Sequence, residues 1–178
     1  MSAGEAALRA AEQHIASPTI TAMDTEAAAA IATWRYPPPY HFYNLAPDVA
    51  PYLLDPRNAY FVARNPAGDL VGFFCYGAEA QVPGGHCAGL YADSTALDMG
   101  LGMHPGRTGG GHGAAFLTAG LAFGRQRFAP ARFRLSVATF NMRAIRAYMR
   151  AGFRPGPVFS SPARGGDLDF LLMVRDSP

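Results

Sequence analysis

The amino-acid sequence predicts an α/β or α+β domain built on a mixed β-sheet. The chain has 178 residues, which suffices for one compact core. Hydrophobic residues make up 49% of it and charged residues 16%, a balance typical of a folded globule and not of a disordered chain. Apolar, strand-like runs alternate with helical segments in the order β-α-α-β-β-β-α-β-α-β, with room for one more strand at the end. This order favours a sheet covered by helices.

The N-terminal residues 1–17 are set apart as an extension, and the domain is expected to occupy residues 18–178. The extension is rich in alanine, and we expect it either to form a helix or to remain a tail. It lacks the basic start and apolar run of a signal peptide, and no stretch of the chain approaches the roughly 20 apolar residues that span a bilayer. The sequence therefore predicts a cytoplasmic protein with no membrane partner.

The first part of the domain is expected to carry one strand and two helices. A short strand is expected at Ile20–Met23. Asp24 or Thr25 then caps a helix that continues to about Trp34, because a short polar side chain satisfies the free N–H groups at a helix start. Three prolines end this helix, and Pro47–Leu54 has the pattern of a second, short one.

The rest of the domain consists of apolar runs separated by turn residues. An antiparallel hairpin is expected around the turn Asn65–Asp69, and residues 81–95 have the composition of a loop. Gly152 is expected to close the last helix. The strands are expected at Ala59–Ala63, Leu70–Tyr76, Ala96–Met103, Phe133–Val137 and Phe170–Val174, and the helices at Gly113–Arg127 and Met142–Ala151.

Composition argues against several classes of partner. The formal net charge is +2, which is too small to indicate a nucleic-acid partner. All 15 basic residues are arginine. The two cysteines, Cys75 and Cys87, fit no zinc pattern, so we expect reduced thiols and no metal site.

The most informative stretch is a strand that leads into a proline, a run of glycines and a helix. Glycines stand at positions 106, 109, 110, 111 and 113, directly before the helical segment. Glycines let the backbone approach an anion closely, and the first free N–H groups of the helix point toward it. The sequence therefore predicts an anion site here, with a merely flexible loop as the alternative.

Two other phosphate-binding motifs compete for this loop. The lysine-bearing P-loop is excluded because the chain has no lysine. The segment Gly109-x-Gly111-x-x-Ala114 satisfies the dinucleotide fingerprint, but no acidic residue ends the next strand at Ser136–Ala138. A dinucleotide-binding oxidoreductase is therefore the weaker alternative.

The segment that follows the glycine-rich loop makes the pattern specific. It carries the spacing Asn-x-x-Ala-x-x-x-Tyr followed by Gly-Phe, at Asn141, Ala144, Tyr148, Gly152 and Phe153. Together with the loop glycines Gly111 and Gly113, it resembles the GNAT superfamily of acyl-CoA-dependent N-acyltransferases. One position departs from that family's pattern, because Thr108 stands where Gln or Arg is usual, with Arg107 one residue earlier.

The resemblance implies a three-layer fold, with a mixed, mostly antiparallel sheet that splays between its fourth and fifth strands and helices on both faces. It also implies acetyl-CoA as the acyl donor, with its pantetheine arm in the splayed gap and its pyrophosphate on the loop amides. The backbone N–H of Met103 would meet the thioester carbonyl, a contact worth about 3–4 kcal/mol when preorganised. The residues expected to contact the coenzyme are Leu101, Met103, Arg107, Thr108, Gly109, Gly110, Gly111, His112, Gly113, Ala114, Asn141, Arg143 and Tyr148.

Several of these residues keep a second interpretation. Asn141 is also a natural helix N-cap, and both roles can hold together. Arg107 and Arg143 either meet the 3′-phosphate of the coenzyme or lie solvated on the surface.

The resemblance also assigns the chemistry. Tyr148 would protonate the leaving thiolate, with packing in the core as its alternative. Asp98 and then Glu79 are the candidates for the base that deprotonates an amine. Asp98 is otherwise a structural aspartate, and Glu79 is otherwise a solvated surface residue.

The expected activity is transfer of an acetyl group to a primary amine by direct attack on the thioester. The acceptor is left open among small amines, amino acids, antibiotics and peptide N-termini, and the protein is expected to be a monomer or a homodimer. Tyr36, Tyr40, Tyr43 and Tyr76 are expected to contact the acceptor, with a dimer contact as the alternative for the first three. A non-catalytic acyl-CoA-binding sensor is the remaining alternative.

Overall fold

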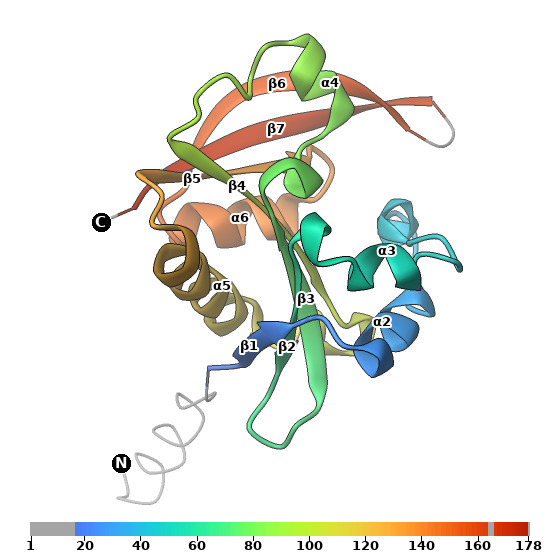
Figure 1. Cartoon of the computed structure of the whole chain (residues 1–178). Coiled ribbons are helices and arrows are strands. Elements are labelled where there is room, and N and C mark those ends of the chain that lie inside the picture. Colours follow the sequence, from blue (N-terminus) through green and yellow to red (C-terminus); the bar gives the residue numbers. More distant parts are fainter. Residues whose placement is uncertain (1–16, 164–165, 178) are drawn as a thin grey trace, which may run out of the picture.

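The computed structural model describes residues 17–163 and 166–177, which fold into a mixed sheet with helices on both faces (Figure 1). The predicted helix or tail at Ser2–Ala16 lies outside the described residues. The strands are β1 (Thr19–Ala22), β2 (Tyr60–Arg64), β3 (Leu70–Tyr76), β4 (Ala96–Met103), β5 (Arg132–Ala138), β6 (Arg154–Ala163) and β7 (Gly166–Asp176). The α-helices are α2 (Thr25–Ala32), α3 (Ala50–Leu54), α4 (Pro83–Cys87), α5 (Gly113–Phe128) and α6 (Met142–Arg150), and the short 3-10 helices are η1 (Tyr40–Tyr43), η2 (Pro56–Asn58), η3 (Gly77–Ala80) and η4 (Pro105–Arg107).

The sheet has the strand order β1-β2-β3-β4-β5-β7-β6, and every neighbouring pair is antiparallel except β4 and β5. The parallel pairing is short, because only Ala96–Asp98 lies in register with Arg132–Arg134. Beyond that point β4 stays beside β3 as far as Met103, and β5 stays beside β7 as far as Ala138. The two strands therefore separate and leave a gap, which confirms the predicted splayed sheet.

The helices form a layer on each face of the sheet. On one face α5 and α6 pack on a core that contains Phe74, Met99 and Phe133. On the other face α2 and α3 pack on Val62 and its neighbours. Fully burying an apolar side chain of this size stabilises a fold by about 1.5–3 kcal/mol, so both layers hold the sheet firmly. This arrangement confirms the predicted three layers.

Glycines bring α5 unusually close to the sheet. A Cβ atom at Gly120 would lie 2.3 Å from the Phe74 ring and 2.7 Å from Met99, and one at Gly124 would lie 2.8 Å from Phe133. Only glycine fits at such contacts. The helix therefore lies directly on β3, β4 and β5, and its N-terminus is fixed at the end of β4.

Two elements of the fold differ from the sequence prediction. Residues 81–95, predicted to be a loop, contain the short helix α4, whose Gly84 N–H donates to the Ser161 hydroxyl at 3.0 Å. The sequence prediction left room for one more strand without giving its residues, and the structure places it as β6, before β7, in a segment that contains three prolines. It pairs with β7 alone and lies at the edge of the sheet, where a missing N–H is tolerated.

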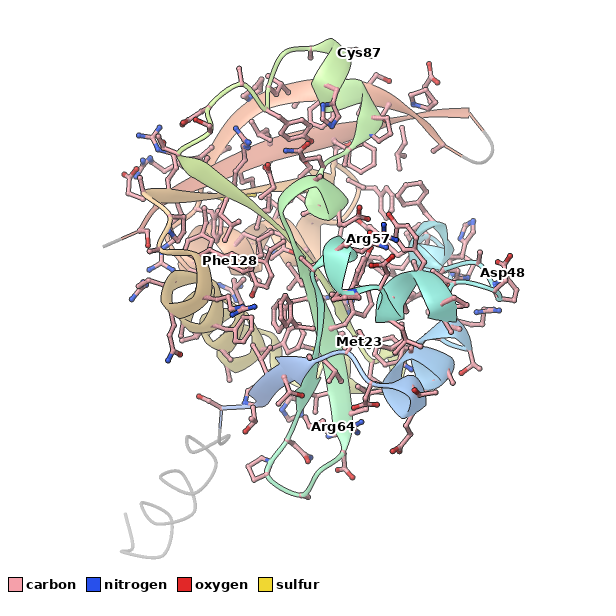
Figure 2. All side chains as sticks on the ribbon, in the orientation of Figure 1. Met23, Asp48, Arg57, Arg64, Cys87 and Phe128 are labelled. Atoms are coloured by element: carbon pink, nitrogen blue, oxygen red, sulfur yellow. The ribbon has the colours of Figure 1, made fainter. Side chains whose placement is uncertain are left out.

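The two cysteines are unpaired in the structure. Cys75 is buried in β3, and burial raises the pKa of its thiol to about 12. Cys87 is exposed at the end of α4, on the outer surface of the molecule (Figure 2). Among the described helices, none is long and apolar enough to cross a membrane.

Candidate active site

The glycine-rich loop forms an open cradle at the N-terminus of α5. Gly109 and Gly111 have φ angles of +87° and +80°, which favour glycine. Within the described part of the chain, none of the amides from Gly109 to Ala115 donates to a backbone carbonyl, and the side chain of His112 does not cap the helix. A Cβ atom at Gly111 or Gly113 would meet nothing within 4 Å. Free donors and open space fit a diphosphate.

Two arginines flank this cradle and differ in their contacts. Arg107 forms an ion pair of 2.9 Å with Asp69 at the β2–β3 turn. The guanidinium of Arg143 lies 5.0 Å from the centre of the Tyr40 ring, and its Nη1 would be 3.9 Å from a Cβ atom at Gly109. Arg143 is therefore beside the loop and unpaired with a carboxylate among the described residues, whereas Arg107 anchors the loop to the hairpin.

A hollow of about 680 Å³ opens between the loop and α2. Its walls include Trp34 and His104, together with five loop residues: Gly106, Arg107, Thr108, Gly110 and His112. The Trp34 and His104 rings meet edge to face at 5.2 Å, and His104 Nδ1 accepts from the Gly106 N–H at 3.0 Å. His104 therefore shapes the turn that begins the cradle.

The splayed edge of β4 presents backbone groups to the gap. The N–H of His104 donates to Val71 in β3 at 3.0 Å, and successive residues of a strand point to alternate sides. The backbone groups of Leu101 and Met103 therefore face the gap. In agreement, the Met103 carbonyl accepts at 2.8 Å from the Tyr36 hydroxyl and not from a strand.

Three of the four tyrosines predicted to contact the acceptor lie across this gap. Tyr36 reaches Met103 on one side, and on the other side the Tyr43 hydroxyl accepts from Asn141 at 3.3 Å. Tyr40 stacks against Arg143. The segment Tyr36–Tyr43 therefore bridges the two sides of the gap, and we call it the aromatic strap.

Tyr76 does not lie in the site, and its predicted acceptor role is corrected. Its side chain is 2% exposed, packs on Phe74 and Phe61, and donates to the Gly120 carbonyl at 2.8 Å. It faces α5 because side chains alternate along β3.

Asn141 and Tyr148 lie on α6 beside the gap. The Asn141 side chain accepts from the Ala144 N–H at 3.2 Å, so it caps the helix. Tyr148 is half-buried and packs against Phe153, with ring centres 6.0 Å apart. Burial, with a smaller contribution from Tyr43, raises the pKa of Tyr148 above its ordinary value of 10.0. Its hydroxyl therefore keeps its proton at neutral pH and can act as an acid.

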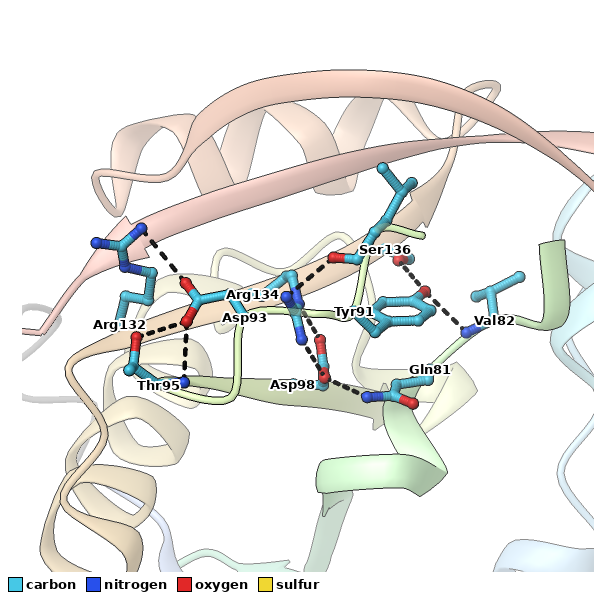
Figure 3. A network of polar contacts seen from close by, with 10 residues as sticks. Gln81, Val82, Tyr91, Asp93, Thr95, Asp98, Arg132, Arg134 and Ser136 are labelled. Carbon is cyan, nitrogen blue, oxygen red and sulfur yellow. Dashed lines mark hydrogen bonds and ion pairs between the residues drawn. The ribbon is translucent and has the colours of Figure 1, made fainter. Parts of the chain in front are cut away.

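Asp98 lies inside a polar network and not at an open surface (Figure 3). It is 3% exposed, and its two oxygens accept from Nε and Nη2 of Arg134 at 2.6 and 2.8 Å. Gln81 donates to the same carboxylate at 2.6 Å. Both oxygens are thus engaged, which favours the structural interpretation of Asp98.

Glu79 is placed differently, in η3 directly after β3. It is half-buried, and it accepts a hydrogen bond from the hydroxyl of Tyr52. This carboxylate raises the pKa of Tyr52 to about 12, so Tyr52 stays protonated. One oxygen of Glu79 engages Tyr52, and the described residues supply no partner for the other.

Three residues that contact the candidate bases were not predicted from the sequence: Arg134, Gln81 and Tyr52. Arg134 carried a usable signal, since a charged residue in an apolar strand at the level of Asp98 suggests an ion pair. Gln81 and Tyr52 stand in irregular segments and had no such signal.

The fold and the cradle define the class of acyl-coenzyme-dependent acyltransferases. Residues 21–153 match the model of the acetyltransferase (GNAT) family, and the chain belongs to this family. It is therefore an acetyltransferase that uses acetyl-CoA, and the dinucleotide-binding alternative is removed.

Solved structures share this fold at low sequence identity. A chimera of spermidine N-acetyltransferase SpeG from Vibrio cholerae and hSSAT is 17% identical over 90% of this chain and 96% of that one, with a TM-score of 0.70. The yncA acetyltransferase from Salmonella typhimurium, solved with acetyl-CoA, is 17% identical over 90% and 94%, with a TM-score of 0.61. Ribosomal-protein-alanine N-acetyltransferase from Brucella melitensis is 17% identical over 89% and 99%, with a TM-score of 0.64. No curated protein matches the sequence.

Proposed function

We propose that the protein transfers an acetyl group from acetyl-CoA to a primary amine by direct attack on the thioester. The observation that carries the proposal is the row of free amides from Gly109 to Ala115 at the N-terminus of α5, next to a gap in the sheet. Free amides and the positive end of the helix dipole bind phosphate groups. The arrangement supports a coenzyme that lies with its phosphates on the loop and its acyl end in the gap.

Acetyl-CoA supplies an activated thioester, whose sulfur leaves as a thiolate. The gap-facing N–H of Met103 serves as the donor to the carbonyl oxygen, where negative charge develops. Tyr148, whose hydroxyl is protonated at neutral pH and lies on α6 beside the gap, delivers its proton to the sulfur. Arg143, beside Gly109, is the better placed of the two arginines for the 3′-phosphate.

We assign the base to Glu79. An amine with a pKa near 10.4 costs about 4.6 kcal/mol to deprotonate at neutral pH, so a carboxylate that accepts this proton raises the rate. Asp98 is the first candidate by sequence, but the ion pair with Arg134 occupies its carboxylate. Glu79 has an accessible carboxylate, and its charge also attracts a protonated amine.

The acceptor is a primary amine, and the aromatic strap forms part of the wall of the site that binds it. Small amines, amino acids, antibiotics and peptide N-termini all fit this description. The SpeG structures are named spermidine N-acetyltransferases. At 17% sequence identity, the similarity supports a shared fold and does not identify spermidine as the acceptor of this chain. Use of acetyl-CoA and two unpaired thiols support a cytoplasmic location.

The experiment is release of free thiol from acetyl-CoA in the presence of a panel of amines, together with coenzyme A binding measured by calorimetry. Gly111→Ala forces a Cβ into a left-handed conformation within the cradle, and we expect weaker coenzyme A binding. Gly68→Ala is the matched control, since Gly68 has φ +89° and equally open space but lies in the β2–β3 turn. Equal loss of binding in both variants would contradict the assigned cradle. Tight binding without thiol release for any amine would favour the sensor.

A further inference from the structure

The buried ion pair between Asp98 and Arg134 lies at the point of the sheet where β4 and β5 stop pairing. These two residues form the last register pair between β4 and β5, and the strands separate immediately after them. Their side chains are 4% and 5% exposed, and the guanidinium binds the carboxylate through two nitrogens at 2.6 and 2.8 Å. Such bidentate contacts fix distance and orientation together.

The same pair also holds the segment that covers this face of the sheet (Figure 3). Gln81, at the start of the β3–β4 connection, donates to Asp98 at 2.6 Å. Near the end of that connection, Arg134 Nη1 donates to the Leu90 carbonyl at 3.0 Å, and the guanidinium lies 5.0 Å from the centre of the Tyr91 ring. Both ends of the connection are therefore tied to one point of the sheet.

Stability alone is a poor explanation for this arrangement. Desolvation of two charges cancels much of their attraction, and apolar residues of similar volume often stabilise a core as well or better. A bidentate pair does supply a defined geometry, which a sheet needs where its backbone pairing ends. The contacts thus favour a geometric role.

We propose that Asp98 and Arg134 form a clasp that fixes where β4 and β5 separate, and so positions the gap that receives the pantetheine arm. Both are positioning residues, since they act through the strands and do not touch the reacting atoms. The inference rests on the proposed function, because the gap has this meaning only if the protein binds acyl-coenzyme A.

The test compares two ligands in calorimetry. Coenzyme A should occupy both the cradle and the gap, whereas adenosine 3′-phosphate 5′-diphosphate carries the same phosphate groups but no pantetheine arm. We expect Asp98→Asn and Arg134→Gln each to weaken coenzyme A binding on the order of tenfold to a hundredfold, the effect of a small misplacement of a binding site. This arm-free nucleotide should bind all variants alike. The double variant should be no weaker than the weaker single variant, because both changes break one contact.

Matched controls come from exposed ion pairs. Arg132 lies two residues before Arg134 on β5 and pairs with Asp93 at 3.5 Å, with a side chain 45% exposed. Arg132→Gln should leave coenzyme A binding unchanged. Should Asp98→Asn fail to fold, Gln81→Met removes one hydrogen bond from the clasp while both charges remain, and it should weaken coenzyme A binding in the same direction.

Each other outcome overturns the clasp. If the variants melt at lower temperature but bind coenzyme A as the wild type does, the ion pair only stabilises the fold. If Asp98→Asn alone removes the acid limb of the kcat–pH profile and Arg134→Gln does not, Asp98 is a base. If the wild type binds no coenzyme A, the proposed function fails first, and the clasp falls with it.

Discussion

At the scale of single residues, Tyr148 carries the most specific chemical assignment. Its pKa is raised by burial, so the hydroxyl stays protonated up to at least its ordinary value of 10.0. We expect Tyr148→Phe to lower kcat on the order of a hundredfold, the low end of the range for general acid catalysis. Coenzyme A affinity should stay unchanged, because the ring still packs on Phe153. Steady-state kinetics and calorimetry measure the two quantities.

A second buried tyrosine provides the control for this prediction. Tyr76→Phe also removes one phenolic hydroxyl, which donates to the Gly120 carbonyl away from the gap. It should cost stability of about 1 kcal/mol and leave kcat unchanged. Because burial raises the pKa of Tyr148 above 10.0, its titration should contribute little to a loss of wild-type activity between pH 7 and 9. Equal kcat in Tyr148→Phe and wild type would remove the assignment.

Glu79 makes a prediction that depends on pH. Without its carboxylate, the amine must lose its proton to solvent before it attacks. We expect Glu79→Gln to lower kcat/KM by about tenfold to a hundredfold at pH 7 and to approach the wild-type rate as pH nears the amine pKa of about 10.4. Rates measured from pH 6 to 10 test this.

A variant of Tyr52 distinguishes the role of the Glu79 carboxylate from that of the hydroxyl that donates to it. Tyr52→Phe removes the bond to Glu79 and leaves the carboxylate in place, so its effect on the rate should be much smaller. A Glu79→Gln profile that runs parallel to the wild type at every pH would argue against the base. Stronger inactivation by Tyr52→Phe would transfer the role to the tyrosine.

At the scale of elements, α2 depends on its N-cap. The Asp24 carboxylate accepts from the Ala27 N–H at 2.8 Å and pairs with Arg64 at 2.9 Å. We expect Asp24→Ala to lower the free energy of unfolding by about 1 kcal/mol at pH 7. The control is Asp48→Ala, since Asp48 is exposed on the connection before α3 (Figure 2) and should change little.

The effect of Asp24 should vanish in acid. The Ala27 N–H, and next Arg64, hold the pKa of Asp24 below its ordinary value of 3.8. A lowered pKa means stability that is present above pH 3.8 and is lost as pH falls through the lower, folded-state value. Urea unfolding at pH 7 and near pH 2.5 should show the difference between wild type and Asp24→Ala shrinking. A constant difference would mean that the charge contributes nothing.

The sequence predicted elements well where local signals agree with tertiary packing. β4 and the start of α5 were predicted at the observed residues, because the apolar run ends at a proline and the glycines end at the helix. The helix α4 has only five residues and depends on Ser161, from a strand far along the chain. Local patterns carry no information about such a partner.

The residues of the site likewise fall into those with a local sequence signal and those whose contacts depend on the tertiary structure. The cradle is contiguous in sequence, so its glycines and the following motif could be recognised together. The contacts of Asp98 and Glu79 could not be, since Arg134 lies 36 residues from Asp98 and Tyr52 lies 27 residues from Glu79. Their pairing depends on strand register and on how the connections fold back. The preference for Glu79 over Asp98 as the base therefore depends on tertiary contacts, which no local sequence pattern shows.

At the scale of the whole molecule, the sheet consists of two halves that meet over a short distance. The strands β1–β4 form one half and β5–β7 the other, and only Ala96–Asp98 pairs with Arg132–Arg134. The clasp, the helix α5 and the aromatic strap complete the connection. A coenzyme in the gap would add backbone hydrogen bonds to a β4 edge that has no strand beside it.

This predicts a local change in hydrogen exchange on binding. The gap-facing amides of Leu101 and Met103 have no strand partner on that side, whereas the alternate amides of β4 bond to β3. With saturating coenzyme A, peptides that span Met99–His104 should exchange deuterium more slowly, because a pantetheine arm covers these amides.

The ligand without the arm distinguishes local cover from general stabilisation. Adenosine 3′-phosphate 5′-diphosphate should slow exchange at Gly109–Ala115 and leave Met99–His104 unchanged. A ligand present at about 100 times its Kd stabilises the whole fold by about 2.7 kcal/mol, which slows only those amides that exchange through global unfolding. Edge amides exchange from the folded state and escape that effect. If both ligands protect β4 equally, or neither does, the gap does not receive the arm.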